Sequence, residues 1–264
     1  MAETVVLKLG GSVITNKAEG KLEVNKANLR QLSQEIAGAL KISHIRLALV
    51  HGAGPFGHVL AKKYELSGGL KGNEQIVGMA LTHQSMENLN QRVVSALQKA
   101  GVNAIAFQPS AAGVLKAGRL VSFQTDTLAR MLDIGLVPVA YGDVLLDMET
   151  GVNILSGDHI VPYLARELPA DRVVIATDVD GIFEADPKDG GKPRKIDVIT
   201  RGNFGKIKLS GSKSTDVTGG MKRKVEELLS LSSAGITSQI ISGLAKGELR
   251  KALLGESKAG TFIK

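Results

Sequence analysis

The sequence predicts an α/β protein with a largely parallel central sheet, and two observations support this. Short runs of β-branched and aliphatic residues alternate along the 264 residues with segments whose apolar residues recur every three or four positions. The runs fit buried strands, the segments fit amphipathic helices, and their alternation is typical of βαβ units. A hydrophobic fraction of 43% beside 22% charged residues is that of an ordinary globular protein.

The predicted elements follow in order along the chain. Strands are expected at 4–9, 46–50, 103–107, 136–141, 172–177 and 238–242, and a hairpin with a glycine-containing turn at 144–155. Helices are expected where apolar residues recur with helical spacing, at 29–40, 86–101 and 126–135, and the last after Gly219-Gly220, ending at Gly235. We expect one continuous sheet, with a functional boundary near residue 170.

The composition restricts the class of protein. No apolar run approaches the roughly 18 residues that a membrane-spanning helix needs. The start, MAETVVLKLGG, enters a strand-like run at once, so neither a signal peptide nor a membrane is expected. The absence of cysteine excludes disulfides and a cysteine nucleophile and fits the cytoplasm. The net charge of +7 is spread along a chain with 3% aromatic residues, so small anionic substrates are expected as partners rather than nucleic acid.

Glycines cluster where strands end or helices begin. The clusters are KLGGS (8–12), HGAGPFG (51–57) and TGGMKRK (218–224). Glycine lets backbone N–H groups approach an anion closely, and a helix N-terminus adds partial positive charge. Since open α/β sheets bind ligands at the carboxyl ends of their strands, the clusters predict a site for several phosphates.

Two lysines lie at positions where a positive charge is normally unfavourable. Lys8 lies inside the first predicted strand, where a buried cation needs a reason. Lys224 follows Lys222 and Arg223 at a helix N-terminus, where the helix dipole disfavours cations. Such exceptions are typical of functional sites. The alternative is that these side chains simply extend to solvent, and Lys17 taken alone is an ordinary loop lysine.

The stretch VHGAGPFGH (50–58) contains G-x-G-x-x-G after a predicted strand, as dinucleotide-binding loops do. Such a loop requires a further strand that ends in an acidic residue about 20 positions later, but residues 64–76 show no strand pattern. We therefore do not expect NAD binding. The chain also lacks the G-x-x-x-x-G-K-[ST] sequence of P-loop enzymes.

Taken together, the motifs resemble those of the amino acid kinase family over essentially the whole length. The motifs that carry the resemblance are KLGGSVIT, HGAGPFGH, QPSA, VPVAYGDV, SGD, TDVDGIFEADP and TDVTGGMKRKVEELL. The resemblance implies a three-layer αβα sandwich with a largely parallel open central sheet. It implies one continuous domain with a phosphate-acceptor lobe at 1–170 and an ATP lobe at 171–264. It also implies a homodimer that uses ATP and Mg²⁺.

Carried over motif by motif, the resemblance implies two sets of site residues. ATP would be held by Lys8, Gly10, Gly11, Ser12, Gly54, Asp178, Gly219, Gly220 and Lys224. The acceptor phosphate would be held by His51, Gly52, Ala53, His58 and Gly157. The catalytic residues would be Lys8, Lys17, His51 and Asp158, with Asp158 orienting the two lysines. No side chain is assigned as a metal ligand.

The paired histidines of HGAGPFGH are similar to the branch of the family that phosphorylates isopentenyl phosphate to isopentenyl diphosphate, a step of isoprenoid biosynthesis. We expect a protonated His51 to touch the bridging oxygen, because a neighbouring dianion raises the pKa of histidine. His58 is expected to hold the acceptor. Met79 and Met86 are interpreted as core residues or, alternatively, as a wall for a prenyl tail. The alternative functions are a phosphonate kinase of the fosfomycin-resistance type and a non-catalytic nucleotide sensor.

Overall fold

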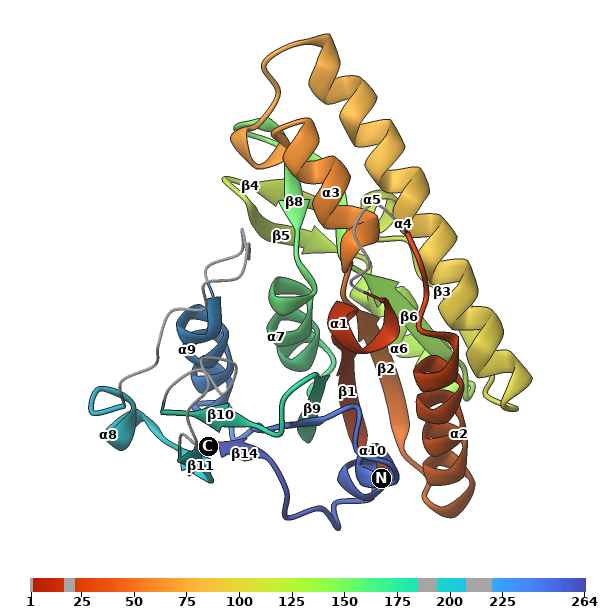
Figure 1. The fold of residues 1–264 in the computed structure, drawn as a ribbon, viewed down its shortest axis with the longest axis vertical. Coiled ribbons are helices and arrows are strands. Elements are labelled where there is room, and N and C mark those ends of the chain that lie inside the picture. Colours follow the sequence, from red (N-terminus) through yellow and green to blue (C-terminus); the bar gives the residue numbers. More distant parts are fainter. Residues whose placement is uncertain (1, 17–21, 185–193, 208–219) are drawn as a thin grey trace.

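The computed structural model describes the chain except residues 1, 17–21, 185–193 and 208–219 (Figure 1). Its centre is an eight-stranded sheet in the order β12-β14-β13-β9-β1-β2-β6-β3. All neighbouring strands in it run parallel except β13 and β14. The strands are β1 (Thr4–Leu9), β2 (Arg46–His51), β3 (Ala104–Ala106), β6 (Val137–Tyr141), β9 (Arg172–Thr177), β12 (Val198–Ile199), β13 (Thr237–Ser242) and β14 (Thr261–Ile263). The predicted largely parallel sheet is confirmed.

Helices cover both faces of this sheet, which gives the three layers (Figure 1). One face packs against α2 (Lys26–Ile42), α4 (Asn73–Lys99) and α10 (Glu248–Leu253), and the other against α6 (Thr125–Asp133), α7 (Gly157–Glu167) and α9 (Gly220–Ser232). Successive residues of a strand point to opposite faces. Accordingly, Val5, Leu7 and Leu9 of β1 join the first core cluster, and Val6 joins the second.

A second, four-stranded sheet in the order β5-β4-β7-β8 stands beyond the end of the central sheet (Figure 1). It consists of β4 (Gly113–Lys116), β5 (Arg119–Phe123), β7 (Asp143–Asp147) and β8 (Gly151–Leu155). The antiparallel pair β7–β8 is the predicted hairpin, which is confirmed. Beside this sheet lie α3 (Pro55–Lys63) and the short 3₁₀ helix η1 (Leu66–Gly68).

Short elements complete the described chain. They are α1 (Gly11–Ile14), α5 (Pro109–Ala112), α8 (Arg201–Phe204), β10 (Ile182–Phe183) and β11 (Lys195–Ile196). Within the ranges that the structure describes, no helix combines the length and the apolar character needed to cross a bilayer.

One helix prediction was incomplete and another was wrong. The helix marked by Met86, Leu89, Val93 and Leu97 extends back to Asn73, because its first turns bury small or polar residues such as Gly78 and Thr82, which show no apolar period. The helix at 220–235 is not the last, since α10 follows it. That helix has six residues, too few to show a clear helical period in the sequence.

Candidate functional site

The loops that follow the parallel strands meet at one edge of the central sheet. The Gly10 N–H donates a hydrogen bond to the carbonyl of Ala176 at the end of β9, at 2.8 Å. The Gly52 N–H donates to the carbonyl of Leu9 at the end of β1, at 2.9 Å. The glycine loops after β1 and β2 are thus joined to neighbouring strand ends, where open α/β sheets bind their ligands.

The first two glycine clusters touch each other directly through their backbones. A Cβ added to Gly11 would lie 2.3 Å from the backbone nitrogen of Gly54, and one added to Gly52 would lie 2.6 Å from that of Gly11. Gly54 also has φ +51°, a conformation that favours glycine. Only glycine at 11 and 52 permits this approach. Ser12, the second residue of α1, follows at the same corner.

An ion-pair cluster lies beside these loops, on the other face of the sheet from α4. Lys8 Nζ is 2.6 Å from Asp158 Oδ1, and Lys224 Nζ is 3.8 Å from the same oxygen. The side chain of Lys8 is 7% exposed, so its charge requires this partner. A Cβ on Gly157 would lie 3.3 Å from Lys8 Cε, so the residue before Asp158 leaves space for the lysine chain.

Asp158 is held in the first turn of α7. Its N–H donates to the side chain of Ser156, the N-cap, at 3.0 Å. Burial alone would raise the pKa of Asp158, but the charges of Lys8 and Lys224 and the hydrogen bond from Lys8 lower it to about 2. At neutral pH this carboxylate is therefore an anion between two cations.

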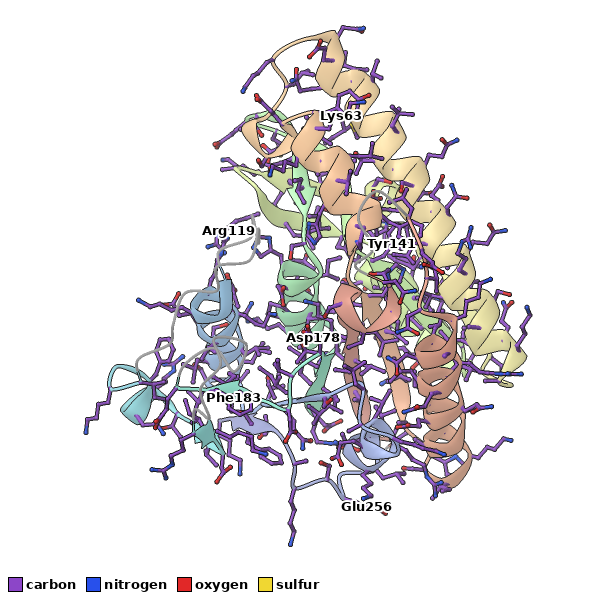
Figure 2. The ribbon with its side chains drawn as sticks, viewed as in Figure 1. Lys63, Arg119, Tyr141, Asp178, Phe183 and Glu256 are labelled. Carbon is purple, nitrogen blue, oxygen red and sulfur yellow. The ribbon has the colours of Figure 1, made fainter. Side chains whose placement is uncertain are left out.

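The structure brings together part of the predicted nucleotide set. Lys8, Asp158 and Lys224 meet as described, although Asp158 was expected to orient Lys8 and Lys17 and here pairs Lys8 with Lys224. Gly220 begins α9, and Asp178 follows β9, where its carboxylate accepts a hydrogen bond from the Thr177 hydroxyl (Figure 2). Lys17 and Gly219 lie outside the described residues, so their roles stay predictions.

His51 corrects the prediction of a charged ring on the phosphate. Its side chain is fully buried, at 0% exposure, and stacks on Tyr141 with 5.5 Å between ring centroids. Nδ1 donates to the carbonyl of Gly52 at 3.0 Å, and Nε2 accepts from the Asn90 amide at 3.2 Å. Burial, opposed by the Gly52 hydrogen bond, lowers the pKa of His51 to about 4. The ring is therefore neutral at pH 7, and both of its nitrogens are engaged within the protein.

The two histidines differ in accessibility. His58 is exposed on α3, one helical turn after the glycines, and its N–H donates to the carbonyl of Gly54 at 3.1 Å. Of the two, His58 is the one whose side chain a ligand in solution reaches. The spacing of the sequence motif does not distinguish the two histidines, because it does not show toward which face of the sheet the side chain of His51, at the end of β2, points.

The two methionines on α4 also differ. Met86 is 1% exposed within the main core and lies under the glycine loop after β2 (residues 52–57), whose predicted ligand is the acceptor and which is called the acceptor loop below. Met86 Sδ is 3.1 Å from where a Cβ of Gly57 would be. Met79 is half-buried against a small apolar cluster between α3, α4 and the second sheet. That cluster comprises Ala61, Tyr64, Leu66, Val144 and Ile154. Met86 is thus a core residue, and Met79 remains beside a partly open apolar wall.

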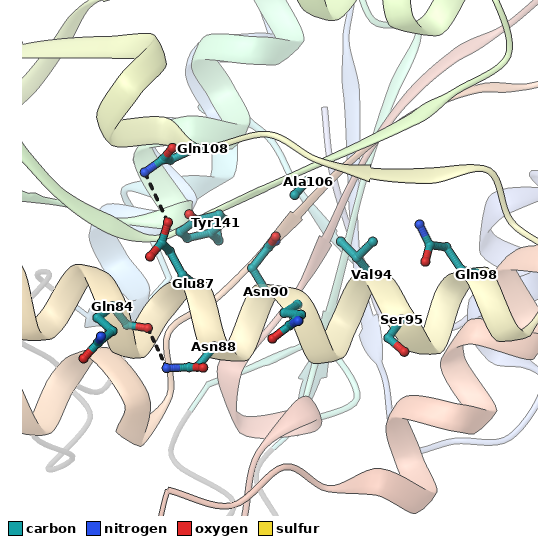
Figure 3. Close-up of a pocket in the computed structure, with 11 residues that line it drawn as sticks. Gln84, Glu87, Asn88, Asn90, Val94, Ser95, Gln98, Ala106, Gln108 and Tyr141 are labelled. Atoms are coloured by element: carbon teal, nitrogen blue, oxygen red, sulfur yellow. Dashed lines mark hydrogen bonds between the residues drawn. The ribbon is translucent and has the colours of Figure 1, made fainter.

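The sequence analysis missed a polar network on α4. His83 Nδ1 is 3.0 Å from Asp143 Oδ2, and its Nε2 is 2.7 Å from the Gln108 amide nitrogen and 3.3 Å from Glu87 Oε1. The one available signal was the presence of polar residues in QPSA and YGDV, directly after predicted strands. From this network a groove of about 820 Å³ runs along α4 toward β3 (Figure 3). Its lining is rich in carboxamides, among them Gln84, Asn88, Asn90, Gln91, Gln98 and Gln108.

Comparisons with known proteins agree with this geometry. The model of the amino acid kinase family matches residues 3–242. The chain is 38% identical to isopentenyl phosphate kinase of Methanothermobacter thermautotrophicus, over 98% of both proteins. It is 39% identical to isopentenyl phosphate kinase of Methanocaldococcus jannaschii, over 98% of this chain and 97% of that protein.

A solved structure of an isopentenyl phosphate kinase superposes with a TM-score of 0.86 and 35% identity, over 99% of this chain and 100% of the other. The family match spans most of the chain, and it includes the strand ends where the glycine loops and the lysine pair meet. The chain belongs to the amino acid kinase family.

Proposed function

We propose that this protein is a kinase that transfers the γ-phosphoryl group of ATP to isopentenyl phosphate, forming isopentenyl diphosphate. The observation that carries the proposal is the Lys8–Asp158–Lys224 cluster beside two glycine loops in backbone contact. Relatives that share 38% and 39% of the sequence over nearly the full length are isopentenyl phosphate kinases. Met79, which is half-buried against the small apolar cluster of Ala61, Leu66 and Val144, supports an acceptor with a hydrocarbon tail.

The arrangement addresses the main obstacle to this reaction, which is repulsion between anions. Two unit charges about 4 Å apart repel by roughly 4 kcal/mol at an effective dielectric constant near 20. Lys8 and Lys224 reach the site from different elements and neutralise charge on the nucleotide phosphates. Asp158 holds the two ammonium groups in place. A phosphoryl group that enters the site then interacts with both ammonium groups while they remain paired with Asp158.

The acceptor needs no catalytic base. A phosphate monoester has a second pKa of about 6, so its oxygens are largely deprotonated at neutral pH. Asp158 is tied to two lysines and its pKa lies at about 2, so it is poorly suited to accept a proton. We assign it to positioning the lysines.

The described residues fit a magnesium ion that is held mainly by the nucleotide. Among them, no three His, Asp or Glu side chains converge as metal ligands, and Asp158 is engaged by lysines. Mg²⁺ commonly binds through substrate phosphates with one or two carboxylates. We propose that Asp178, which follows β9 at the carboxyl ends of the strands, supplies a carboxylate for this purpose. When bound, the ion neutralises the β- and γ-phosphate oxygens.

We further propose that His58, not His51, contacts the acceptor phosphate, while His51 supports the loop from below. His58→Ala should lower kcat/KM for the acceptor by about 10²-fold, the usual cost of losing a donor to the reacting phosphate. The KM of ATP should stay within a factor of two to three. Steady-state kinetics with each substrate varied in turn measures both.

His44→Ala is the matched control, because His44 is also exposed but lies between α2 and β2. It should behave as the parent protein does. Normal acceptor kinetics in His58→Ala would remove His58 from the site.

The function is tested by a coupled ADP-release assay over a panel of acceptors: isopentenyl phosphate, dimethylallyl phosphate, fosfomycin and N-acetylglutamate. We expect isopentenyl phosphate to give the highest kcat/KM. A preference for fosfomycin would establish the phosphonate kinase instead. Nucleotide binding without turnover on any of these acceptors would favour a sensor.

We propose a homodimer, with the acceptor lobe at 1–170 and the ATP lobe at 171–264 in each subunit. Supporting the homodimer, β3 is the last strand of the central sheet in the described part of the chain, and its residue Ala106 lines the carboxamide-rich groove of α4 (Figure 3). Light scattering during gel filtration should give twice the chain mass of 27.8 kDa. Ser95→Arg, in that groove, should shift the mass to that of one chain.

A further inference from the structure

His83 lies on α4 between two carboxylates. Its Nδ1 is 3.1 and 3.0 Å from the two oxygens of Asp143, and its Nε2 is 3.3 Å from Glu87 Oε1. The side chain of Asp143 is fully buried at 0% exposure, whereas that of Glu87 is 50% exposed. A buried carboxylate is stable only when a cation or several donors compensate its charge. Besides His83, the N–H of Val144 donates to the Asp143 carboxylate, at 2.8 Å.

Asp143 belongs to the corner that joins β6 to β7, and this corner forms part of the acceptor site. The Gly142 N–H donates to the carbonyl of His51, at the start of the acceptor loop, at 3.1 Å. A Cβ on Gly142 would lie 3.5 Å from the backbone nitrogen of Gly157 and 3.9 Å from Ala53 Cβ. The residue before Asp143 is therefore packed against two residues assigned to the acceptor phosphate.

The same turn of α4 also contacts the acceptor loop. The Ser85 hydroxyl donates to the carbonyl of Phe56 at 2.8 Å, and Met86 lies under Gly57. The segment 83–86 thus makes one contact with the β6–β7 corner and two with the loop. His83 therefore lies in the segment of α4 that joins the corner to the loop.

We propose that His83 is a positioning residue for the acceptor: its positive charge holds the Tyr141–Asp143 corner against the acceptor loop, so that acceptor binding, but not ATP binding, depends on its protonation. The proposal rests on the proposed kinase function. It adds pH regulation of the acceptor site through a residue that does not touch the substrate.

Two states of the ring are defined by its neighbours. The protonated ring donates from Nδ1 to Asp143 and from Nε2 to Glu87, while the neutral ring keeps the Asp143 bond and accepts at Nε2 from Gln108. Ser110 Oγ lies 3.3 Å from Nδ1 and carries no charge. The hydrogen bond with Asp143 raises the pKa of His83, against desolvation, and the charge of Glu87 adds to the rise. Burial raises the pKa of nearby Tyr141 as well, so its hydroxyl stays protonated throughout.

The test measures KM for isopentenyl phosphate and for ATP from pH 6 to 9.5 in the parent protein, His83→Gln, Asp143→Asn and the double variant. Each single variant should raise the acceptor KM by about tenfold, within the range for residues coupled to a site. The double variant removes both charges and should return the acceptor KM to within threefold of the parent. The KM of ATP should not change in any of them.

The pH profile separates charge from packing. The quantity compared is the ratio of the acceptor KM of the parent protein to that of His83→Gln at each pH. This ratio should rise as the pH passes through the raised pKa of His83, because the parent protein then loses the positive charge. Titration of the acceptor phosphate and of His58 is common to both proteins and cancels in the ratio. Glu87→Gln, at a half-exposed position, should retain the fold and move the midpoint of this ratio to lower pH.

Three results overturn the proposal: additive losses in the double variant, a constant KM ratio across pH, or an unmoved midpoint in Glu87→Gln. Circular dichroism of each variant at pH 7 checks folding, and Glu87→Gln remains decisive if the Asp143 variants do not fold. If the parent protein has no activity on isopentenyl phosphate at any pH, the proposed function fails instead. Activity that responds to none of these substitutions overturns only the role of His83.

Discussion

Lys8→Met is expected to lower kcat by about 10²–10³-fold while the KM of the acceptor changes little. In the proposed reaction Lys8 stabilises the negative charge that develops on the transferred phosphoryl group, and losing one preorganised donor of this kind typically has an effect of that size. Methionine retains most of the buried chain and removes only the ammonium group. Single-turnover measurements with saturating ATP and isopentenyl phosphate report the chemical step directly.

The matched control is Lys41→Met, an exposed lysine in the last turn of α2 that should leave kcat unchanged. Among the described lysines, the loss of Lys8 leaves the more distant Lys224 as the partner of Asp158. The pKa of Asp158 should therefore rise from about 2 toward its ordinary value. Near-normal kcat in Lys8→Met would show that this lysine stabilises the fold but not the reaction.

Gly11→Ala is expected to reduce kcat/KM for both substrates by about 10²-fold. The new Cβ would lie 2.3 Å from the backbone nitrogen of Gly54, whereas ordinary contacts begin near 3.4 Å, so the loops must separate by roughly an ångström. A displacement of that size in a phosphoryl-transfer site can cost about 10² in rate. Steady-state kinetics with each substrate varied measures both losses.

Gly205→Ala is the control for this substitution. Gly205 ends α8 with φ −64°, and no atom of the described residues lies within 4 Å of an added Cβ. It should retain full activity. A Gly11→Ala protein that loses activity toward one substrate alone would indicate that the two loops act independently.

Much of the fold follows from local sequence. Strands such as β1 and β9 are buried over most of their length and read as continuous apolar runs, so their positions were predictable. The strands β4 and β5 were not predicted, because most of their residues are at least partly exposed and they depend on pairing with each other and with β7. The apolar pattern of α4 does not show where the helix begins, because its first turns pack through Gly78 and Thr82 rather than large side chains.

The candidate site was predictable where it requires residue types that are unusual at their positions in the sequence. A lysine inside a strand and glycines at strand ends identified Lys8, Gly11 and Gly54, and the structure brings them together. The sequence does not show in which direction a side chain points. His51 faces inward toward Asn90 and Tyr141, so the histidine expected to carry charge is neutral. His83 and Asp143 are 60 positions apart, and only the fold brings them together.

If the loops after β1 and β2 bind the two substrates as proposed, the backbone contact between Gly11 and Gly54 should also couple these substrates thermodynamically. Two loops that touch without side chains between them lose freedom together, so a ligand that orders one loop bears part of the entropy cost of ordering the other. Nucleotide binding should then increase acceptor affinity, and by linkage the acceptor should increase nucleotide affinity by the same factor. Heterotropic cooperativity would thus arise in this protein without a hinge or a change of shape, because Gly11 and Gly54 have no side chains to keep the two loops apart.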